Sequence, residues 1–192
     1  MDATYFGTMM VKMGDADGLV SGACHSTADT LRPALQILKT APGTKLVSAF
    51  FVMCTDTPQF GTDGTLIFAD CGLNINPSSD ELSEIAIASA HSWSTFMGNV
   101  EPHVAMLSYS TMGSAGGEVA KKVQEAVKFC KGEGSRARHR RRPAARRRHR
   151  PHRRPAQRPP APPSPVRPTC SSFPDLEAGN IGYKLVQRFA GA

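Results

Sequence analysis

Residues 63–90 read DGTLIFADCGLNINPSSDELSEIAIASA and hold a turn, a strand and the start of a helix in one run. Asp63-Gly64 is a pair typical of hairpin turns, and the apolar residues 65–70 are predicted to form a strand after it. Residues 78–81, Ser-Ser-Asp-Glu, have the spacing of a capping box, so a long helix is expected over about residues 80–96. A strand followed by a helix is the unit from which α/β proteins are built.

The same alternation of strands and helices extends on both sides of this run. Residues 46–54 form a continuous apolar segment of strand length, which is typical of a strand covered on both faces. In the helix expected over residues 30–39, Pro33 is tolerable only in the first turn. Further elements are predicted as helices over residues 3–13, 118–130 and 182–190 and as short strands over residues 19–23 and 104–107. The predicted fold is therefore α/β with a largely parallel sheet.

A strongly basic block, residues 135–172, interrupts this pattern. It holds thirteen of the chain's 23 lysine and arginine residues, no acidic residue and nine of the 15 prolines. The remaining ten basic residues, set against 16 acidic ones, give the rest of the 192-residue chain a net charge of −6, although the whole chain carries +7. Because the block has almost no large apolar side chains, we expect a disordered Arg/Pro-rich insert that binds phosphate backbones without specificity.

A reading-frame error is the alternative interpretation of this block. Arginine, proline, histidine and alanine without lysine are what a GC-rich gene yields when it is read out of frame. One permitted codon string for residues 138–144, RHRRRPA, reads DIVDGPL when it is moved by one base, and that is an ordinary strand-and-turn sequence. Residues 135–172 are thus expected to be either a disordered segment or an out-of-frame product.

The composition also argues against several classes of protein. Five scattered cysteines without a C-x-x-C pair argue against a disulfide framework and a structural zinc site, and they fit a reducing compartment. There is no apolar run of about 18 residues, so no transmembrane helix is expected. The N-terminal residues lack the basic and apolar regions of a signal peptide. We predict a cytoplasmic protein with no metal and no membrane partner.

Two polar segments have the residues needed to bind an anion such as phosphate. The loop over residues 108–117, SYSTMGSAGG, lies between a predicted strand and a predicted helix, where backbone N–H groups and hydroxyls can be aimed at a phosphate. Arg32 follows the polar residues 25–30 near a helix start and is suited to bidentate phosphate binding. Each has a plainer alternative: the loop is a flexible connection, and Arg32 is a surface residue paired with Asp29.

Four stretches of the chain resemble the phosphate acetyltransferase (phosphotransacetylase) family, within the wider phosphate acetyl/butyryl transferases. They read YFGTMMVKMGDADGLVSGACHSTADTLRPALQILKTAPG, DGTLIFADCGLNINPSSDELSEIAIASA, VAMLSYSTMGSA and FPDLEAGNIGYKLVQRFAGA. Together they cover about residues 1–131 and 173–192. A weaker likeness is to the acetyltransferase-like C-terminal domain of some malic enzymes.

This resemblance implies a fold and an activity. The family has two α/β domains, each with three α/β/α layers, like the isocitrate and isopropylmalate dehydrogenases. Residues 1–42 would then end the first domain, and residues 43–192 would form most of the second, so the fold would be incomplete. The family moves an acetyl group between acetyl phosphate and coenzyme A (CoA), which is a substrate; it uses no other cofactor and no metal, and its members are commonly homodimers. The preferred acyl group, whether acetyl, propionyl or butyryl, stays open.

The resemblance also assigns roles to individual residues. Arg32 and Arg188 would be the catalytic arginines, and the substrate-binding residues lining the cleft would be Ser26, Thr27, Ser108, Ser110, Thr111 and Ser114. The CoA thiolate would attack the acyl carbonyl, while arginines and backbone donors stabilise the oxyanion and the leaving phosphate. Family chains begin well upstream of Asp2 and continue past Ala192 into an N-D-L-S-R-G motif that carries the proposed base. We therefore expect this chain to be a fragment with little activity alone.

A nucleic-acid-binding protein built on an α/β remnant is the competing interpretation. It rests on the arginines of residues 135–172, whose binding would weaken steeply with salt. No aromatic residue lies among residues 135–168, so base stacking is not supported. We rank the enzyme first and expect no specific nucleic-acid partner.

Overall fold

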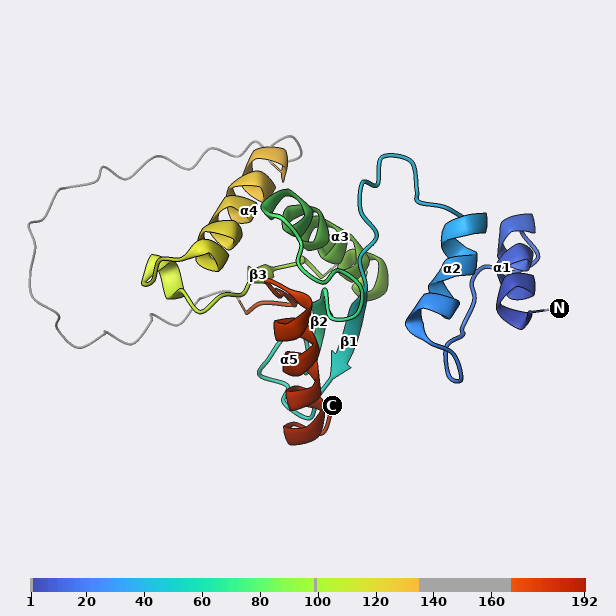
Figure 1. Cartoon of the computed structure of the whole chain (residues 1–192). Coiled ribbons are helices and arrows are strands. Elements are labelled where there is room, and N and C mark those ends of the chain that lie inside the picture. Colours follow the sequence, from blue (N-terminus) through green and yellow to red (C-terminus); the bar gives the residue numbers. More distant parts are fainter. Residues whose placement is uncertain (1, 99, 135–166) are drawn as a thin grey trace, which may run out of the picture.

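Four strands form one mixed sheet in the computed structural model, which describes residues 2–98, 100–134 and 167–192. The strand order is β1-β2-β4-β3, with bounds Phe50–Cys54, Thr65–Ala69, Cys170–Ser172 and Val104–Met106 respectively (Figure 1). β1 and β2 are antiparallel, whereas β4 lies between β2 and β3 and runs parallel to both. The prediction of a largely parallel sheet is therefore corrected at β1, which a hairpin joins to β2.

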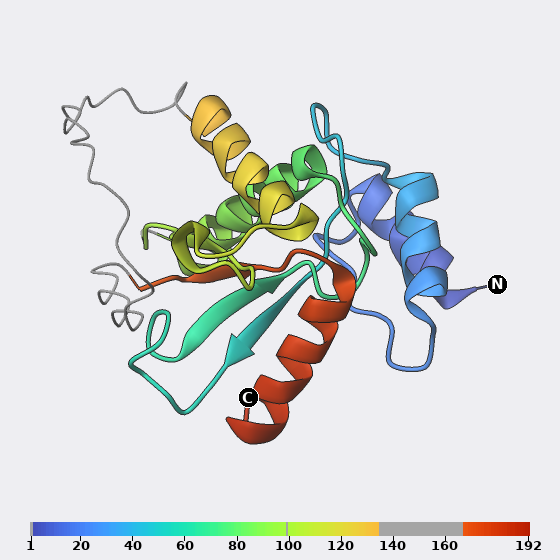
Figure 2. The same ribbon diagram turned by 60° about the vertical axis from the view of Figure 1, so that its left-hand side comes forward.

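Helices cover both faces of this sheet. α3 (Ser79–Met97) packs against β2 and β4, and α4 (Glu118–Gly134) packs on α3, so both lie on one side. α5 (Leu176–Phe189) packs against β1 and β2 on the opposite side, as Figure 2 shows. α1 (Ala3–Met13) and α2 (Thr27–Ile37) lie side by side and stand apart from the sheet (Figure 1). The result is an α/β arrangement of four strands and five α-helices among the described residues.

The two faces of the sheet have separate apolar cores because successive strand side chains point to opposite faces. On the α3 side, Ile67 and Cys170 pack with Trp93, and all three are almost fully buried. On the α5 side, Phe68 meets Phe173 edge-to-face, with ring centroids 5.3 Å apart. The central strands β2 and β4 are thus covered on both faces.

The local signals in residues 63–90 are confirmed. Asp63 and Gly64 have φ values of 49° and 80°, and the flanking Thr62 and Thr65 exchange backbone hydrogen bonds of 2.9 and 3.1 Å, which makes a tight hairpin turn. At the start of α3, the Glu81 N–H donates to Ser78 Oγ and the Ser78 N–H donates to Glu81 Oε2. The backbone hydrogen bond from Ser78 lowers the pKa of Glu81, so the capping carboxylate stays ionised to more acidic pH.

Four predicted elements need correction, and the first is the helix expected over residues 182–190, which begins six residues earlier, at Leu176, because Asp175 caps it. Residues 19–23 do not form a buried strand, because Val20 is fully exposed and no partner strand is paired with them among the described residues. The strand expected over residues 46–54 is limited to β1, an edge strand on which Phe51 and Val52 are exposed. α2 begins at Thr27, three residues earlier than expected, because Ser26 caps it, and this places Pro33 inside the helix and beyond its first turn.

β4 corrects the C-terminal boundary of the predicted Arg/Pro-rich block. Residues 169–172 are buried, and the Thr169 hydroxyl accepts from the His103 N–H at 2.9 Å while the Thr169 N–H donates to the His103 carbonyl. Residues 169–172 are therefore part of the folded sheet and are not part of a disordered insert. The two interpretations of the block still apply to residues 135–166, which lie outside the described residues.

No helix in the described ranges has the length and apolar character that crossing a bilayer requires.

The burial of Cys71 and Cys170 predicts slow alkylation. None of the five cysteines, all within the described residues, forms a disulfide; Cys24 and Cys54 are exposed. Burial, assisted by the neighbouring Asp70 carboxylate, raises the pKa of Cys71 to about 12, and burial also raises the pKa of Cys170. Since the thiolate is the nucleophile, both buried thiols should react slowly at pH 8.

Iodoacetamide at pH 8 is therefore expected to modify Cys24 and Cys54 first, with peptide mass spectrometry as the measurement. Adding urea should bring Cys71 and Cys170 to the same rate as the exposed pair. Equal rates for all four cysteines without denaturant would contradict the sheet described here.

Candidate functional site

The carboxyl ends of the parallel strands define one edge of the sheet where a ligand can bind. β3 leads into α4 on one face, and β4 leads into α5 on the opposite face, so the connections diverge between these neighbouring strands. In open α/β sheets such a divergence leaves a crevice outside the carboxyl ends of the strands. The start of α5 lies at this edge, where the Ala178 N–H donates to Asp175 Oδ1 at 2.8 Å. α4 and α5 thus both follow strands that end at this edge, and helix N-termini favour anions.

The loop over residues 108–117 at this edge is ordered by its own polar side chains. Ser110 Oγ donates to the Ala115 carbonyl at 2.7 Å and accepts from the Ala115 N–H at 3.1 Å. The Tyr109 hydroxyl donates to the Gly116 carbonyl at 2.7 Å. A 3₁₀ turn, η1 (Thr111–Gly113), lies within the loop. These bonds argue against a plain flexible connection.

The four predicted substrate-binding residues of this loop differ in what their side chains do. The Ser108 hydroxyl bonds to the Ser110 backbone, and the Ser110 hydroxyl bonds to Ala115, so both are used within the loop. Thr111 is exposed, and the Ser114 N–H donates to the Thr111 carbonyl. The structure thus brings the four residues together in one loop after β3, and Thr111 presents its side chain to solvent.

Arg32 lies on α2 beside the residues that start the helix. Ser26 caps α2, because its Oγ accepts from the Asp29 N–H and donates to Asp29 Oδ2 at 2.6 Å. Asp29 Oδ1 in turn accepts from Arg32 Nη1 at 3.2 Å, with both side chains more than half exposed. The contact that Arg32 makes is therefore the surface pair with Asp29 expected under the plainer alternative. The pair leaves the guanidinium accessible.

A cavity of about 450 Å³ joins α2 to the loop that follows β2. Its lining consists of Thr27, Ala28, Leu31, Arg32, Leu35, Gln36 and Leu73. Two predicted site residues, Thr27 and Arg32, therefore share one cavity, with Ser26 next to them at the helix start. Sequence reasoning missed Leu73 and Gln36. The position of Leu73, four residues after the end of β2 at the carboxyl edge, was the available signal.

Arg188 is not in that cavity. It lies in the last turn of α5, which begins at the carboxyl edge and leads away from it. From Leu176 to Arg188 the helix rises about 18 Å. The structure thus places the two predicted catalytic arginines in different regions of the described chain.

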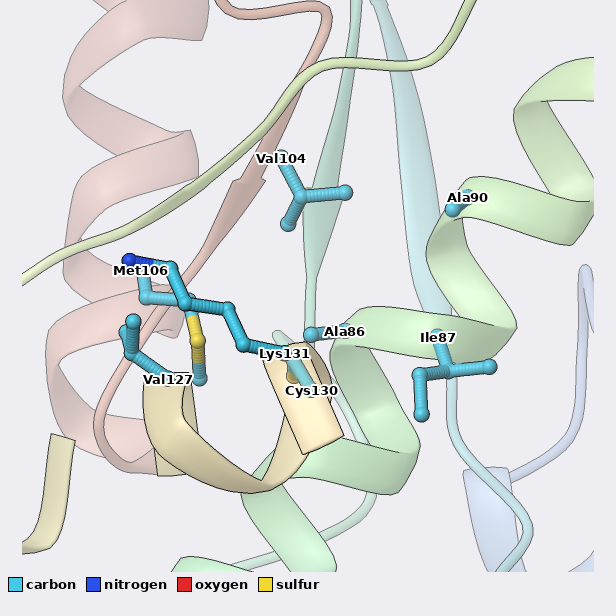
Figure 3. Close-up of a pocket in the computed structure, with 8 residues that line it drawn as sticks. All are labelled: Ala86, Ile87, Ala90, Val104, Met106, Val127, Cys130 and Lys131. Carbon is cyan, nitrogen blue, oxygen red and sulfur yellow. The ribbon is translucent and has the colours of Figure 1, made fainter. Parts of the chain in front are cut away.

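A second cavity, of about 310 Å³, lies beside the outer strand β3 (Figure 3). Its lining, from α3, β3 and α4, consists of Ala86, Ile87, Ala90, Val104, Met106, Val127, Cys130 and Lys131. Lys131 is the one charged side chain among these, and its chain extends over Met106 in Figure 3. None of the predicted site residues lines this cavity, and its apolar walls offer little to hold a phosphate. The cavity beside Arg32 is the better candidate site.

Metal chemistry has no obvious ligand set here. Within residues 2–98, 100–134 and 167–192, no group of three or more His, Cys, Asp or Glu side chains is arranged to hold a metal ion.

Comparisons with known proteins match one family. The family model described as phosphate acetyl/butaryl transferase matches residues 1–137. Phosphate acetyltransferases from Acetivibrio thermocellus and Bacillus subtilis are 49% and 46% identical to the chain, over 100% and 98% of it. A solved structure titled EutD phosphotransacetylase from Staphylococcus aureus has a TM-score of 0.73 and 39% identity, and covers 98% of this chain.

The chain is shorter than these proteins. It spans 57% and 55% of the two curated relatives and 56% of the Staphylococcus aureus chain.

The exposure of the Arg32–Asp29 pair predicts a small effect of Arg32→Ala on stability. Exposed ion pairs contribute from about 0 to 1 kcal/mol, so the free energy of unfolding in urea should fall by less than about 1 kcal/mol. Trp93→Ala, in the core beside α3, is the contrasting variant and should cost about 3–5 kcal/mol. A loss above about 2 kcal/mol for Arg32→Ala would show that Arg32 supports the fold.

Proposed function

Because the chain belongs to the phosphate acetyl/butaryl transferase family, we propose that it carries part of the site of a phosphate acetyltransferase. The reaction converts acetyl phosphate and CoA to acetyl-CoA and phosphate, reversibly. The observation that carries the proposal is the shared cavity of Thr27 and Arg32 beside the loop after β2. The relatives named phosphate acetyltransferase, 49% and 46% identical over nearly the whole chain, support the same substrates.

The N-terminal turn of α2 is the proposed phosphate-binding element. Thr27 and Ala28 line the cavity from the first turn of the helix, where backbone N–H groups and the helix dipole favour an anion. The Arg32 guanidinium can exchange its exposed partner Asp29 for a phosphate at small cost, since exposed pairs are weak. A phosphate offers it two oxygens for bidentate binding.

The proposed chemistry is a direct acyl transfer. The CoA thiolate attacks the carbonyl carbon of acetyl phosphate, a carbon–sulfur bond forms, and the carbon–oxygen bond to phosphate breaks with its electrons leaving on phosphate. Arg32 stabilises the charge on the departing phosphate, which is larger after cleavage than before it. The Ser26 and Thr27 hydroxyls and the loop over residues 108–117 complete the cleft around the reacting groups.

Arg188 is proposed to hold a distant part of CoA. CoA is an extended molecule with its own phosphates, so a cation about 18 Å along α5 from the carboxyl edge can bind one end while the thiol reacts elsewhere. This accounts for two functional arginines that do not share a cavity.

The domain organisation and setting are part of the proposal. Residues 1–42 form the end of one α/β domain, and residues 43–192 form most of a second one of the isocitrate dehydrogenase type. The separation of α1 and α2 from the sheet in Figure 1 supports the boundary. The complete enzyme is a cytoplasmic homodimer, and the odd number of scattered cysteines in the sequence supports a reducing compartment.

Calorimetric titration of the purified chain tests the proposal. The chain should bind acetyl phosphate, and Arg32→Ala should weaken that binding at least tenfold, equivalent to about 1.4 kcal/mol. Arg188→Ala should weaken CoA binding and leave acetyl phosphate unaffected. Lys184→Ala, which removes an exposed cation from the same helix, is the control and should change neither affinity.

Unchanged acetyl phosphate affinity in Arg32→Ala would remove the assigned role of Arg32. Absence of binding for both substrates by the wild-type chain would overturn the proposed site.

A further inference from the structure

The carboxylate of Asp70, directly after β2, is buried and saturated with hydrogen bonds. Its side chain accepts from the backbone N–H groups of Gly72 at 2.8 Å, Leu73 at 2.9 Å and Asn74 at 3.4 Å. It also accepts from Asn74 Nδ2 at 2.6 Å and from the Ala49 N–H at 3.1 Å. Asp70 is 2% exposed. Five donors therefore converge on two carboxylate oxygens.

This saturation narrows what Asp70 can do chemically. A carboxylate has about four lone-pair sites, and five donors occupy them here. No site is left to accept a proton from a substrate thiol. Asp70 therefore has a structural role: its carboxylate fixes the backbone of the turn formed by residues 72–74.

Hydrogen bonds also tie the turn to the segment before β1 and to α5. Asn74 Nδ2 donates to the Val47 carbonyl at 3.0 Å, which ties the turn to the segment before β1. Asn180 Nδ2 on α5 donates to the Cys71 carbonyl at 3.3 Å. Gly179 lies so close to the Asp70 carbonyl that a methyl group there would collide with it. The turn is thus built to hold one position.

This turn places Leu73 at the candidate site. It is the one residue lining the cavity beside Arg32 that does not come from α2, so it forms the opposite wall. Its backbone N–H is bound directly by Asp70. We propose that Asp70 is a positioning residue, whose carboxylate keeps Leu73 against α2 and so sets the width of the acetyl phosphate cavity. The inference rests on the proposed function for the identity of the ligand.

The affinity for acetyl phosphate should depend on the position of Leu73. α2 has few contacts with the sheet, so the distance between Arg32 and the far wall depends on where the turn holds Leu73. If the turn loosens, the acyl end of the ligand loses its apolar wall while the phosphate contacts of α2 remain. The affinity for acetyl phosphate should then fall, and the affinity for inorganic phosphate should change little.

The experiment compares Asp70→Asn, Leu73→Ala and the double variant in the full chain. Asp70→Asn keeps the side-chain size but removes the charge and one acceptor, so amide hydrogen exchange at residues 72–74 should accelerate at least tenfold. Acetyl phosphate affinity should fall about tenfold in each single variant and no further in the double variant, because both changes remove the same wall. Inorganic phosphate affinity should stay within twofold of wild type.

Val123→Ala is the matched control, since it removes core contacts between α3 and α4 away from the cavity. It should lower the stability of the chain and leave acetyl phosphate affinity unchanged. Wild-type exchange or wild-type affinity in Asp70→Asn overturns the inference, as does an equal affinity loss in Val123→Ala or additive losses in the double variant. If the wild-type chain binds no acetyl phosphate, the proposed function fails, and the exchange result alone decides whether Asp70 positions the turn.

Discussion

The pairing of β4 with β2 and β3 is the interaction on which the rest of the structure depends. Only three residues long, β4 joins the β1–β2 hairpin to β3 through hydrogen bonds such as Ile67 N–H to the Thr169 carbonyl and Leu107 N–H to the Ser172 carbonyl. A two-stranded hairpin alone is marginally stable in water. Without β4 the hairpin would lack a parallel neighbour, and α3 would lose the Cys170 side of its core.

The same strand also leads into α5, which packs against the turn at the candidate site. Because β4 leads into α5 on one face while β3 leads into α4 on the other, the chain diverges at the carboxyl edge and leaves space there. α5 then packs Gly179 and Asn180 against the turn that carries Leu73. The cavity beside Arg32 is lined by α2 and by Leu73, and α5 supports it indirectly by packing against the turn that carries Leu73.

Local interactions explain which features could be predicted from the sequence. The Asp63-Gly64 turn and the Ser78–Glu81 capping box depend on residues a few positions apart, so their patterns were sufficient. β4 depends on partners more than sixty residues away, and its short segment among prolines carries no strand pattern. The apolar residues 19–23 look like a strand, but their side chains have no sheet to join within the described chain.

The residues of the candidate site also divide into those that a local motif identifies and those that depend on distant partners. Arg32 and Thr27 were identified because their motif matches a family, and the structure brings both to one cavity. Asp70 and Leu73 belong to no recognisable catalytic pattern, because their roles arise from a turn whose partners, Ala49 and α5, are distant in sequence. The loop over residues 108–117 was located correctly between β3 and α4, but the bonds that order it could not be read from its composition.

Amide hydrogen exchange of Ile67, Leu107 and Phe173 is the most direct test of the central place of β4. Each of these N–H groups donates across a β4 junction, to Thr169, Ser172 and Ala69 carbonyls respectively. All three N–H groups are expected to exchange slowly and with one common protection factor, because breaking either junction unfolds the sheet. Exchange of Leu107 and Phe173 as fast as that of the exposed Val20 would show that β4 is not inserted between β2 and β3 and does not hold the sheet together.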